Sequence, residues 1–241
     1  MRKNTLPIPD LLDRLEMFHG AQEPSWPVEP YEFIVWWHCG YPPSDAACGK
    51  GWQKLNQEVG IGPDQLLRVS QAKLISALRP GGMVPELRAQ RLKEVALRVK
   101  NEFAGDLRAA LNGPISTARK KLKMFPGIAD PGADRILLFG NLSPIAAVPS
   151  NCVHVLLRIQ NGPERKSYSV NYRMAQQLIA AEVPEKFDAR TRAYLLLKRH
   201  GQEVCKSSKP RCEACPLSGR CAFFAGNRRA KGNNSRGKKA G

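Results

Sequence analysis

The sequence predicts an all-α protein. Apolar residues recur at three- and four-residue steps through most of 30–204, and Gly and Pro separate these segments. Patterns typical of β-strands are scarce. The composition, 42% hydrophobic and 24% charged among 241 residues, is that of a globular chain with a real core. No stretch reaches the roughly 20 uncharged apolar residues of a membrane span, so no membrane partner is expected.

The helical segments follow one another along the chain. A short helix is expected from Pro9 to Phe18, before a Pro-rich link. Residues 30–39, PYEFIVWWHC, are apolar nearly all round and predict a buried helix. Further helical patterns occupy 52–59, 63–70, 71–78, 84–103, 115–125, 153–159, 172–183 and 189–204. Residues 225–241, rich in Gly, Asn, Lys and Arg, predict a basic disordered tail.

The charge indicates a polyanionic partner. Lys and Arg total 38 against 21 Asp and Glu, a net charge of +17, and removing six cations of the tail still leaves +11. Nucleic acid is the expected partner; an anionic membrane surface, as the second reading of this charge, and a solubilising surface are the alternatives. The basic start MRKN is followed by acids and not by an apolar segment, so we expect a cytoplasmic protein, nucleoid-associated if bacterial.

Four of the seven cysteines lie within seventeen residues, in the spacing C-x6-C-x2-C-x5-C. They are Cys205, Cys212, Cys215 and Cys221. In a cytoplasmic chain such a group indicates metal binding rather than disulfides. Four thiolates in one compact loop can each bind one iron atom of a 4Fe–4S cluster. Zinc is the alternative, although it favours two separate C-x2-C pairs.

This spacing, with Pro216 after the third cysteine, resembles the C-terminal loop of the endonuclease III and adenine glycosylase branch of DNA glycosylases. The resemblance covers about residues 28–224. It implies two helical lobes with a DNA groove between them: a six-helix barrel with a helix–hairpin–helix motif at 30–143, and a cluster domain at 1–29 with 144–224. In this family the cluster is structural, and the loop after the first cysteine presents basic residues to DNA phosphates. Those residues here are Lys206, Lys209 and Arg211; the alternative is a solvated loop with incidental charge.

Residues 115–139 resemble the helix–hairpin–helix motif. Gly127 allows the tight turn, Ile128 fills the gap between the helices, and Ala133 permits their close crossing. Ala129 stands where the usual pattern has a second glycine. Backbone N–H groups at the start of the second helix can bind a phosphate, and the resemblance adds a monovalent cation at this turn.

The resemblance also places a DNA-wedging loop at RPGGMV, residues 79–84. Met83 would then fill the base stack when a base is flipped out. The alternative is a surface turn whose methionine packs on a helix. Together these features predict a monomer that binds double-stranded DNA, damaged or distorted.

The chain departs from the family at the two positions that carry its chemistry. The lysine that forms a Schiff base is replaced by Pro131, and the catalytic aspartate by Pro149. Proline supplies no acid, base or nucleophile, which excludes the lysine-dependent lyase reaction and argues against the usual hydrolysis. We expect Asp130 to cap the second hairpin helix and Pro131 to take its first position. Asp130 and Asp134 are the candidates for a relocated catalytic group. Other polar residues near the expected pocket are Ser150, Asn151, His38, Cys39 and His154.

Three hypotheses follow from the sequence. The first is a base-excision-repair DNA glycosylase, an N-glycosylase-type hydrolase with non-standard catalytic residues. The second is a non-catalytic DNA-binding protein that recognises damage, and the third is a cluster protein for electron transfer or redox sensing. The complete DNA-binding frame favours the first two, and only the cysteines favour the third.

Overall fold

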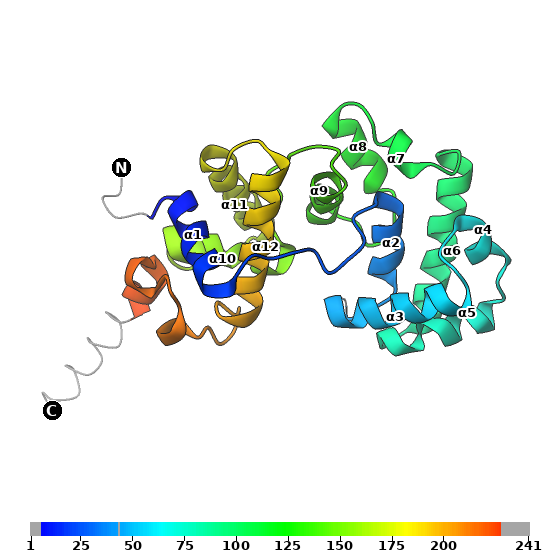
Figure 1. The fold of residues 1–241 in the computed structure, drawn as a ribbon, viewed down its shortest axis with the longest axis horizontal. Coiled ribbons are helices and arrows are strands. Elements are labelled where there is room, and N and C mark those ends of the chain that lie inside the picture. The colour runs from blue at the N-terminus through cyan, green and yellow to red at the C-terminus, as the bar shows by residue number, and fades with distance from the viewer. Residues whose placement is uncertain (1–5, 43, 228–241) are drawn as a thin grey trace, which may run out of the picture. The chain divides into compact units, whose positions relative to one another are not determined.

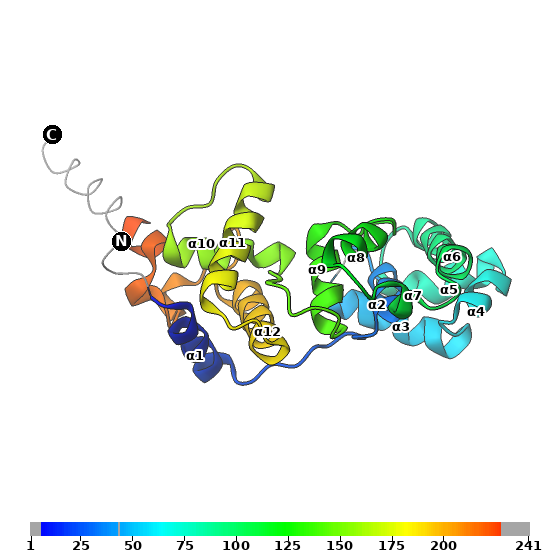
Figure 2. The ribbon, with the colours of Figure 1, turned by 90° about the horizontal axis from the view of Figure 1, so that it is seen from above.

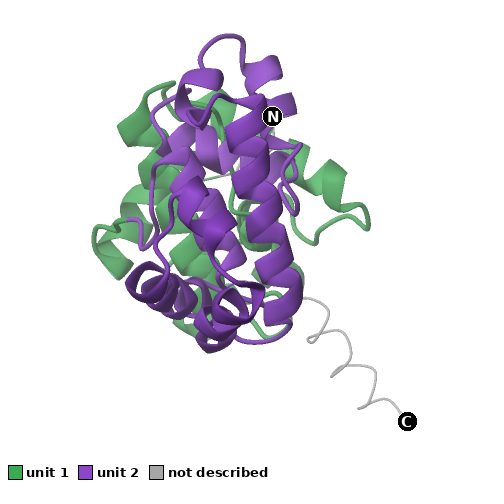
Figure 3. Cartoon of the chain, turned by 90° about the vertical axis from the view of Figure 1, so that its right-hand side faces the viewer, with its two compact units in different colours: residues 1–23, 144–241 green, residues 24–143 purple. Residues whose placement is uncertain are grey.

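The computed structural model describes residues 6–42 and 44–227, and it confirms the all-α prediction. Within these residues the chain is helical, and its one strand-like pairing is an isolated parallel bridge between Tyr41 and Gly82. The chain divides into two compact units (Figure 3), residues 24–143 and residues 1–23 with 144–241. Residues 222–227 are helical, and the rest of the predicted basic tail lies outside the described residues.

The unit of residues 24–143 contains eight α-helices in its described part (Figure 1). They are α2 (Pro30–His38), α3 (Asp45–Glu58), α4 (Pro63–Arg68), α5 (Gln71–Leu78), α6 (Pro85–Glu102), α7 (Leu107–Ala110), α8 (Ile115–Leu122) and α9 (Asp130–Phe139), with a 3-10 turn at Arg79–Gly81. Side-chain caps begin four of them: Glu29 at α2, Ser44 at α3, Ser70 at α5 and Asp106 at α7. Proline stands in the first turn of α2, α4, α6 and α9, where no backbone N–H is needed.

Helix α2 is the buried helix that its apolar sequence predicts. Trp36 is 2% exposed, and Phe33 and Trp26 lie close to its ring. The guanidinium of Arg135, from α9, lies 3.7 Å from the centre of the Trp26 ring and 4.7 Å from that of Phe33. A buried cation is tolerated there because aromatic faces attract it. This contact fixes α9, the second helix of the predicted hairpin, against α2.

The other unit joins the first helix to the C-terminal helices (Figure 2). Its elements are α1 (Ile8–His19), a 3-10 turn at Ser150–Cys152, α10 (Val153–Gln160), α11 (Tyr168–Glu182), α12 (Phe187–Glu203), and 3-10 turns at Cys212–Ala214 and Ser218–Arg220. Helix α1 packs on α11 and α12, and Leu11 and Leu15 are fully buried in the shared core. Cys205, Cys215 and Cys221 border this core. The cysteine loop is therefore held by packing from both ends of the chain.

The division into a barrel domain at 30–143 and a cluster domain at 1–29 with 144–224 stays a prediction, as does the groove between them.

Candidate cluster and DNA-binding sites

The predicted hairpin has the geometry that its sequence requires. Helix α8 ends at Leu122 and α9 begins at Asp130. Between them Gly127 has a φ of +72°, a left-handed conformation that glycine adopts without strain. Ile128 is 6% exposed, and its side chain lies against the backbone of Gly132. Ala133 is fully buried, so the two helices can approach closely.

Asp134, one of the two catalytic candidates, is buried within the hairpin. Its side chain is completely inaccessible, and its Oδ1 accepts a hydrogen bond of 2.6 Å from Nε of Arg119 on α8. A fully buried carboxylate that pairs with an arginine of the neighbouring helix ties the two helices together. A substrate could reach Asp134 only if this pair opened.

Asp130 is exposed, but the expectation that it caps α9 is wrong. The residue before the helix is Ala129, and no side chain caps the first turn. Asp130 is the first helical residue, so Pro131 takes the second position rather than the first. The Asp130 carboxylate instead forms a 2.7 Å ion pair with Lys123, which follows α8. Lys123 attracts the carboxylate away from the backbone N–H groups that a cap would bind.

Pro149 stands directly before the 3-10 turn that leads into α10. Its φ of −61° and ψ of 123° are extended, which suits the entry to a helical segment. Ser150 and Asn151 are exposed in this turn. His154 lies in α10, and its Nε2–H donates to the carbonyl of Cys205 at 2.6 Å. His154 therefore supports the cysteine loop.

His38 and Cys39, at the end of α2, are both buried. The Sγ of Cys39 donates to the carbonyl of Val35 at 3.2 Å, and burial raises the pKa of the thiol well above its ordinary range. Burial lowers the pKa of His38 to about 4, so the ring is neutral at physiological pH. The Cε1 of His38 lies 3.7 Å from the position that a Cβ on Gly127 would take. His38 therefore packs beneath the hairpin turn, whereas Cys39 lies against α3, its Cβ 3.1 Å from the position that a Cβ on Gly51 would take.

The 79–84 loop is built by a residue that sequence reasoning missed, Arg88. Its side chain is 2% exposed and donates to the carbonyl oxygens of Cys39 at 2.7 Å, Gly82 at 2.8 Å and Met83 at 2.9 Å. Tyr41 adds two backbone hydrogen bonds of 2.9 Å, from its N–H to Gly81 and to its carbonyl from Met83. The sequence does contain a sign that Arg88 is buried, because its position in the helical repeat falls among the apolar residues that form the buried face of α6.

This anchored loop presents apolar side chains to solvent. Met83 is 58% exposed, and Tyr41, Val84 and Leu87 are each exposed by more than 40%. Val84 has a φ of +49°, a strained conformation for a β-branched residue. Met83 is therefore exposed on an anchored loop, and its role as a DNA wedge stays a prediction.

The structure brings the four cysteines together around one pocket. Cys205, Cys212, Cys215 and Cys221 line a space of about 350 Å³, open solvent included. Burial raises the pKa of Cys205 to about 11 and also raises that of Cys215, so these sulfurs are protonated thiols until a metal displaces the protons. Within the described residues, no three His, Cys, Asp or Glu side chains converge as the ligands of one metal ion do. Four cysteines that line one pocket are consistent with a 4Fe–4S cluster, because each of its iron atoms takes one thiolate.

Arg158 shapes the loop between the first two cysteines, and sequence reasoning missed it as well. It is 6% exposed and donates to the carbonyls of Lys206 at 2.9 Å and Ser207 at 2.8 Å. It also forms a 2.9 Å ion pair with Glu164. Of the predicted phosphate contacts, Lys209 and Arg211 are exposed and Lys206 is half-buried. The loop thus has a fixed backbone and free cationic ends.

Comparison with known proteins defines the class first. The fold matches an endonuclease III in a non-covalent DNA complex, with a TM-score of 0.72 and 19% identity over 92% of this chain and 97% of that one. It also matches a thermostable thymine-DNA glycosylase, with a TM-score of 0.70 and 19% identity over 89% and 95%. The chain therefore has the endonuclease III fold.

Sequence relatives agree with this fold. A thymine/uracil-DNA glycosylase of Pyrobaculum aerophilum is 24% identical over 163 residues, 67% of each protein. Endonuclease III of Sulfolobus acidocaldarius is 26% identical over 182 residues, 73% of this chain and 74% of that protein. No family model matches the chain. The chain is thus similar, in sequence at about 25% identity and in fold, to the endonuclease III and thymine-DNA glycosylase superfamily of helix–hairpin–helix DNA glycosylases. No helix in its described part is long and apolar enough to cross a membrane.

Proposed function

We propose that this protein binds damaged or distorted duplex DNA with the scaffold of a base-excision glycosylase. The hairpin carries the proposal: Gly127 turns the chain in a left-handed conformation, and α9 then directs its N-terminus towards a phosphate. A monovalent cation at this turn belongs to the same proposal. Lys206, Lys209 and Arg211 add phosphate contacts, which supply affinity without reading sequence.

The 79–84 loop would wedge the duplex. Met83 is exposed at the tip of a loop that Arg88 fixes through three backbone carbonyls. A wedge must hold its shape while it separates stacked bases, because the unstacking costs a few kcal/mol. The buried arginine supplies that rigidity, and the apolar tip supplies the surface that replaces a base.

We also propose that Cys205, Cys212, Cys215 and Cys221 hold a 4Fe–4S cluster with a structural role. The shared pocket supports the cluster, and zinc is the other outcome. Such a cluster supplies cross-links between the iron corners and the chain, and it replaces the core that a short loop cannot build. Iron and acid-labile sulfide assays on the purified protein test this part directly, and zinc without sulfide would contradict it.

Two alternatives describe what the protein does to the DNA it binds: excision of a base by a relocated catalytic group, or binding without catalysis. Excision with a relocated group would rest on Asp130, which is exposed and forms its 2.7 Å ion pair with the exposed Lys123. A non-catalytic role is favoured by the burial of Asp134 against Arg119 and by the prolines at positions 131 and 149. On either candidate, a lyase reaction through a lysine at position 131 is excluded by the proline.

One incubation series tests these candidates. Cluster-loaded protein in excess is mixed with duplexes that carry uracil, oxidised pyrimidines, alkylated purines, deaminated purines, mismatches or an abasic site. Each sample is heated in alkali and separated on a denaturing gel, and binding is measured on the same duplexes. A break at one lesion that disappears in Asp130→Asn identifies a glycosylase with a relocated group. Binding without any break identifies a DNA-binding protein, and absence of binding to every duplex refutes the proposal.

A further inference from the structure

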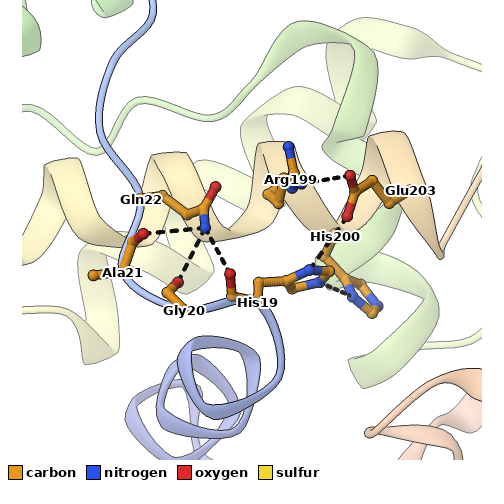
Figure 4. Close-up of polar contacts among 7 residues, drawn as sticks. All are labelled: His19, Gly20, Ala21, Gln22, Arg199, His200 and Glu203. Atoms are coloured by element: carbon orange, nitrogen blue, oxygen red, sulfur yellow. Dashed lines mark hydrogen bonds and ion pairs between the residues drawn. The ribbon is translucent and has the colours of Figure 1, made fainter.

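Two buried histidines form a chain of polar contacts in the cysteine-bearing unit (Figure 4). His19 Nε2, at the end of α1, lies 3.1 Å from Nδ1 of His200 in α12. The side chain of His19 is 3% exposed, and His200 is 1% exposed. The second ring nitrogen of His200, Nε2, lies 3.5 Å from Sγ of Cys215. The chain ends at Glu203, whose carboxylate lies 3.5 Å from His19 Nδ1.

The surroundings hold this array in place. Gln22 Nε2 lies between 2.9 and 3.2 Å from three backbone carbonyl oxygens at the end of α1, those of His19, Gly20 and Ala21. Arg199 forms a 2.7 Å ion pair with Glu203 one helical turn away. Both imidazoles therefore have partners on each ring nitrogen, and the partners themselves are anchored. The direction of each hydrogen bond in the array depends on which ring nitrogens carry hydrogen.

We propose that His200 donates an Nε2–H···S hydrogen bond to Cys215 as a ligand of the 4Fe–4S cluster, and that His19 fixes the tautomer that makes His200 a donor. The inference rests on the proposed cluster. A cluster-bound sulfur is a thiolate, which can only accept, so the hydrogen must stand on His200 Nε2. Nδ1 of the neutral His200 ring is then an acceptor, and His19 Nε2–H supplies its hydrogen. The Glu203 carboxylate can only accept, so His19 Nδ1 also carries a hydrogen, and His19 completes the array as an imidazolium whose charge Glu203 balances.

This hydrogen bond gives His200 a tuning role. An N–H dipole that points at a ligand sulfur stabilises the more negative, reduced state of the cluster and so raises its reduction potential. His154 lies near the same loop but donates to the backbone carbonyl of Cys205 rather than to a sulfur. Of the described histidines, His200 is therefore the one placed to act on the sulfur itself. His19 acts through His200 and is a positioning residue.

The test uses the full chain and a double-mutant cycle. The variants are His200→Phe, His19→Phe and the double variant, with His38→Phe as the matched control because it removes a buried imidazole from the other unit. Iron and acid-labile sulfide are measured first, and the midpoint potential follows from a dye-mediated titration monitored by electron paramagnetic resonance. We expect a more negative potential for His200→Phe, a shift of the same sign for His19→Phe, and no change for His38→Phe. The double variant should shift no further than His200→Phe alone, because both act through one hydrogen bond.

The failures of the two proposals are distinguishable. Wild-type protein without iron and sulfide would overturn the proposed cluster and this inference with it. A loaded wild type and a loaded His200→Phe variant with equal potentials would overturn this inference and leave the cluster intact. Additive shifts in the double variant would overturn the positioning role of His19. If His200→Phe takes up no iron, the potential of His19→Phe decides, and an unchanged value refutes the array.

Discussion

Replacement of Arg119 by methionine should destabilise the protein strongly, because it removes the arginine partner of a fully buried carboxylate. The Asp134 side chain is 0% exposed and its Oδ1 lies 2.6 Å from Arg119 Nε. Breaking a buried ion pair from one side costs about 3–5 kcal/mol. The Arg119 side chain is 33% exposed, so solvent screens part of the interaction and the lower end, about 3 kcal/mol, applies. At about 2–4 °C per kcal/mol for a protein of this size, the melting temperature should fall by about 6–12 °C.

Thermal and urea unfolding followed by circular dichroism measure this loss. Lys123→Met is the matched control, because it breaks the exposed pair with Asp130 and should cost less than about 1 kcal/mol. The double variant Arg119→Met with Asp134→Leu should recover most of the stability, since it removes both charges from the hairpin. The reasoning is refuted if Arg119→Met costs no more than Lys123→Met. Loss of base release in Asp134→Asn at unchanged stability would instead identify Asp134 as catalytic.

Three further predictions concern pH, DNA and packing. Burial lowers the pKa of His38 to about 4 in the folded protein, so the unfolded chain binds a proton at a higher pH than the folded chain does. The free energy of unfolding should therefore be unaffected above pH 6.5 and should fall by up to about 3 kcal/mol as the pH drops to 4. Urea unfolding across this range should show a shallower loss for His38→Leu, and an equal loss would exclude His38 as the cause. Lys209→Glu and Arg211→Glu should each weaken duplex binding and lower the slope of its salt dependence by about one, as measured by filter binding. The charge control in the same titration is Lys73→Glu, a substitution at an exposed position of α5. A Cβ on Gly201 would lie 2.5 Å from Sγ of Cys152, so Gly201→Ala should lower the free energy of unfolding, measured in urea, by about 1–3 kcal/mol. If this clash is the cause, adding Cys152→Ala should restore the lost stability.

The pattern of the chain alone determined the helical class, the hairpin turn and the cysteine group. Periodicity reports burial, so PYEFIVWWHC predicted the buried α2, and α1 was predicted to within one residue at each end. The turn at Gly127 was predictable from local sterics, because glycine adopts a left-handed backbone conformation without strain. The spacing of four cysteines likewise limits which metal they can surround, because it depends on residues close in sequence.

Tertiary structure decided the roles of the charged side chains. Asp130 and Asp134 were equivalent candidates in the sequence, yet one is exposed and the other is buried against Arg119. Arg88 and Arg158 were not singled out from the sequence, yet each is buried and organises a loop through backbone carbonyls. The contacts that separate these cases join residues distant in sequence, 49 positions apart for Arg88 and Cys39.

The same distinction applies to the histidine array. His19 and His200 are 181 residues apart and meet only because α1 packs on α12. A buried polar group forms hydrogen bonds with the partners that the fold brings near it, because leaving such a group unpaired costs about 1–3 kcal/mol. Local pattern therefore determines which elements form, whereas the partner of each buried polar group depends on how the elements pack, and for this protein that packing decides which residues can act.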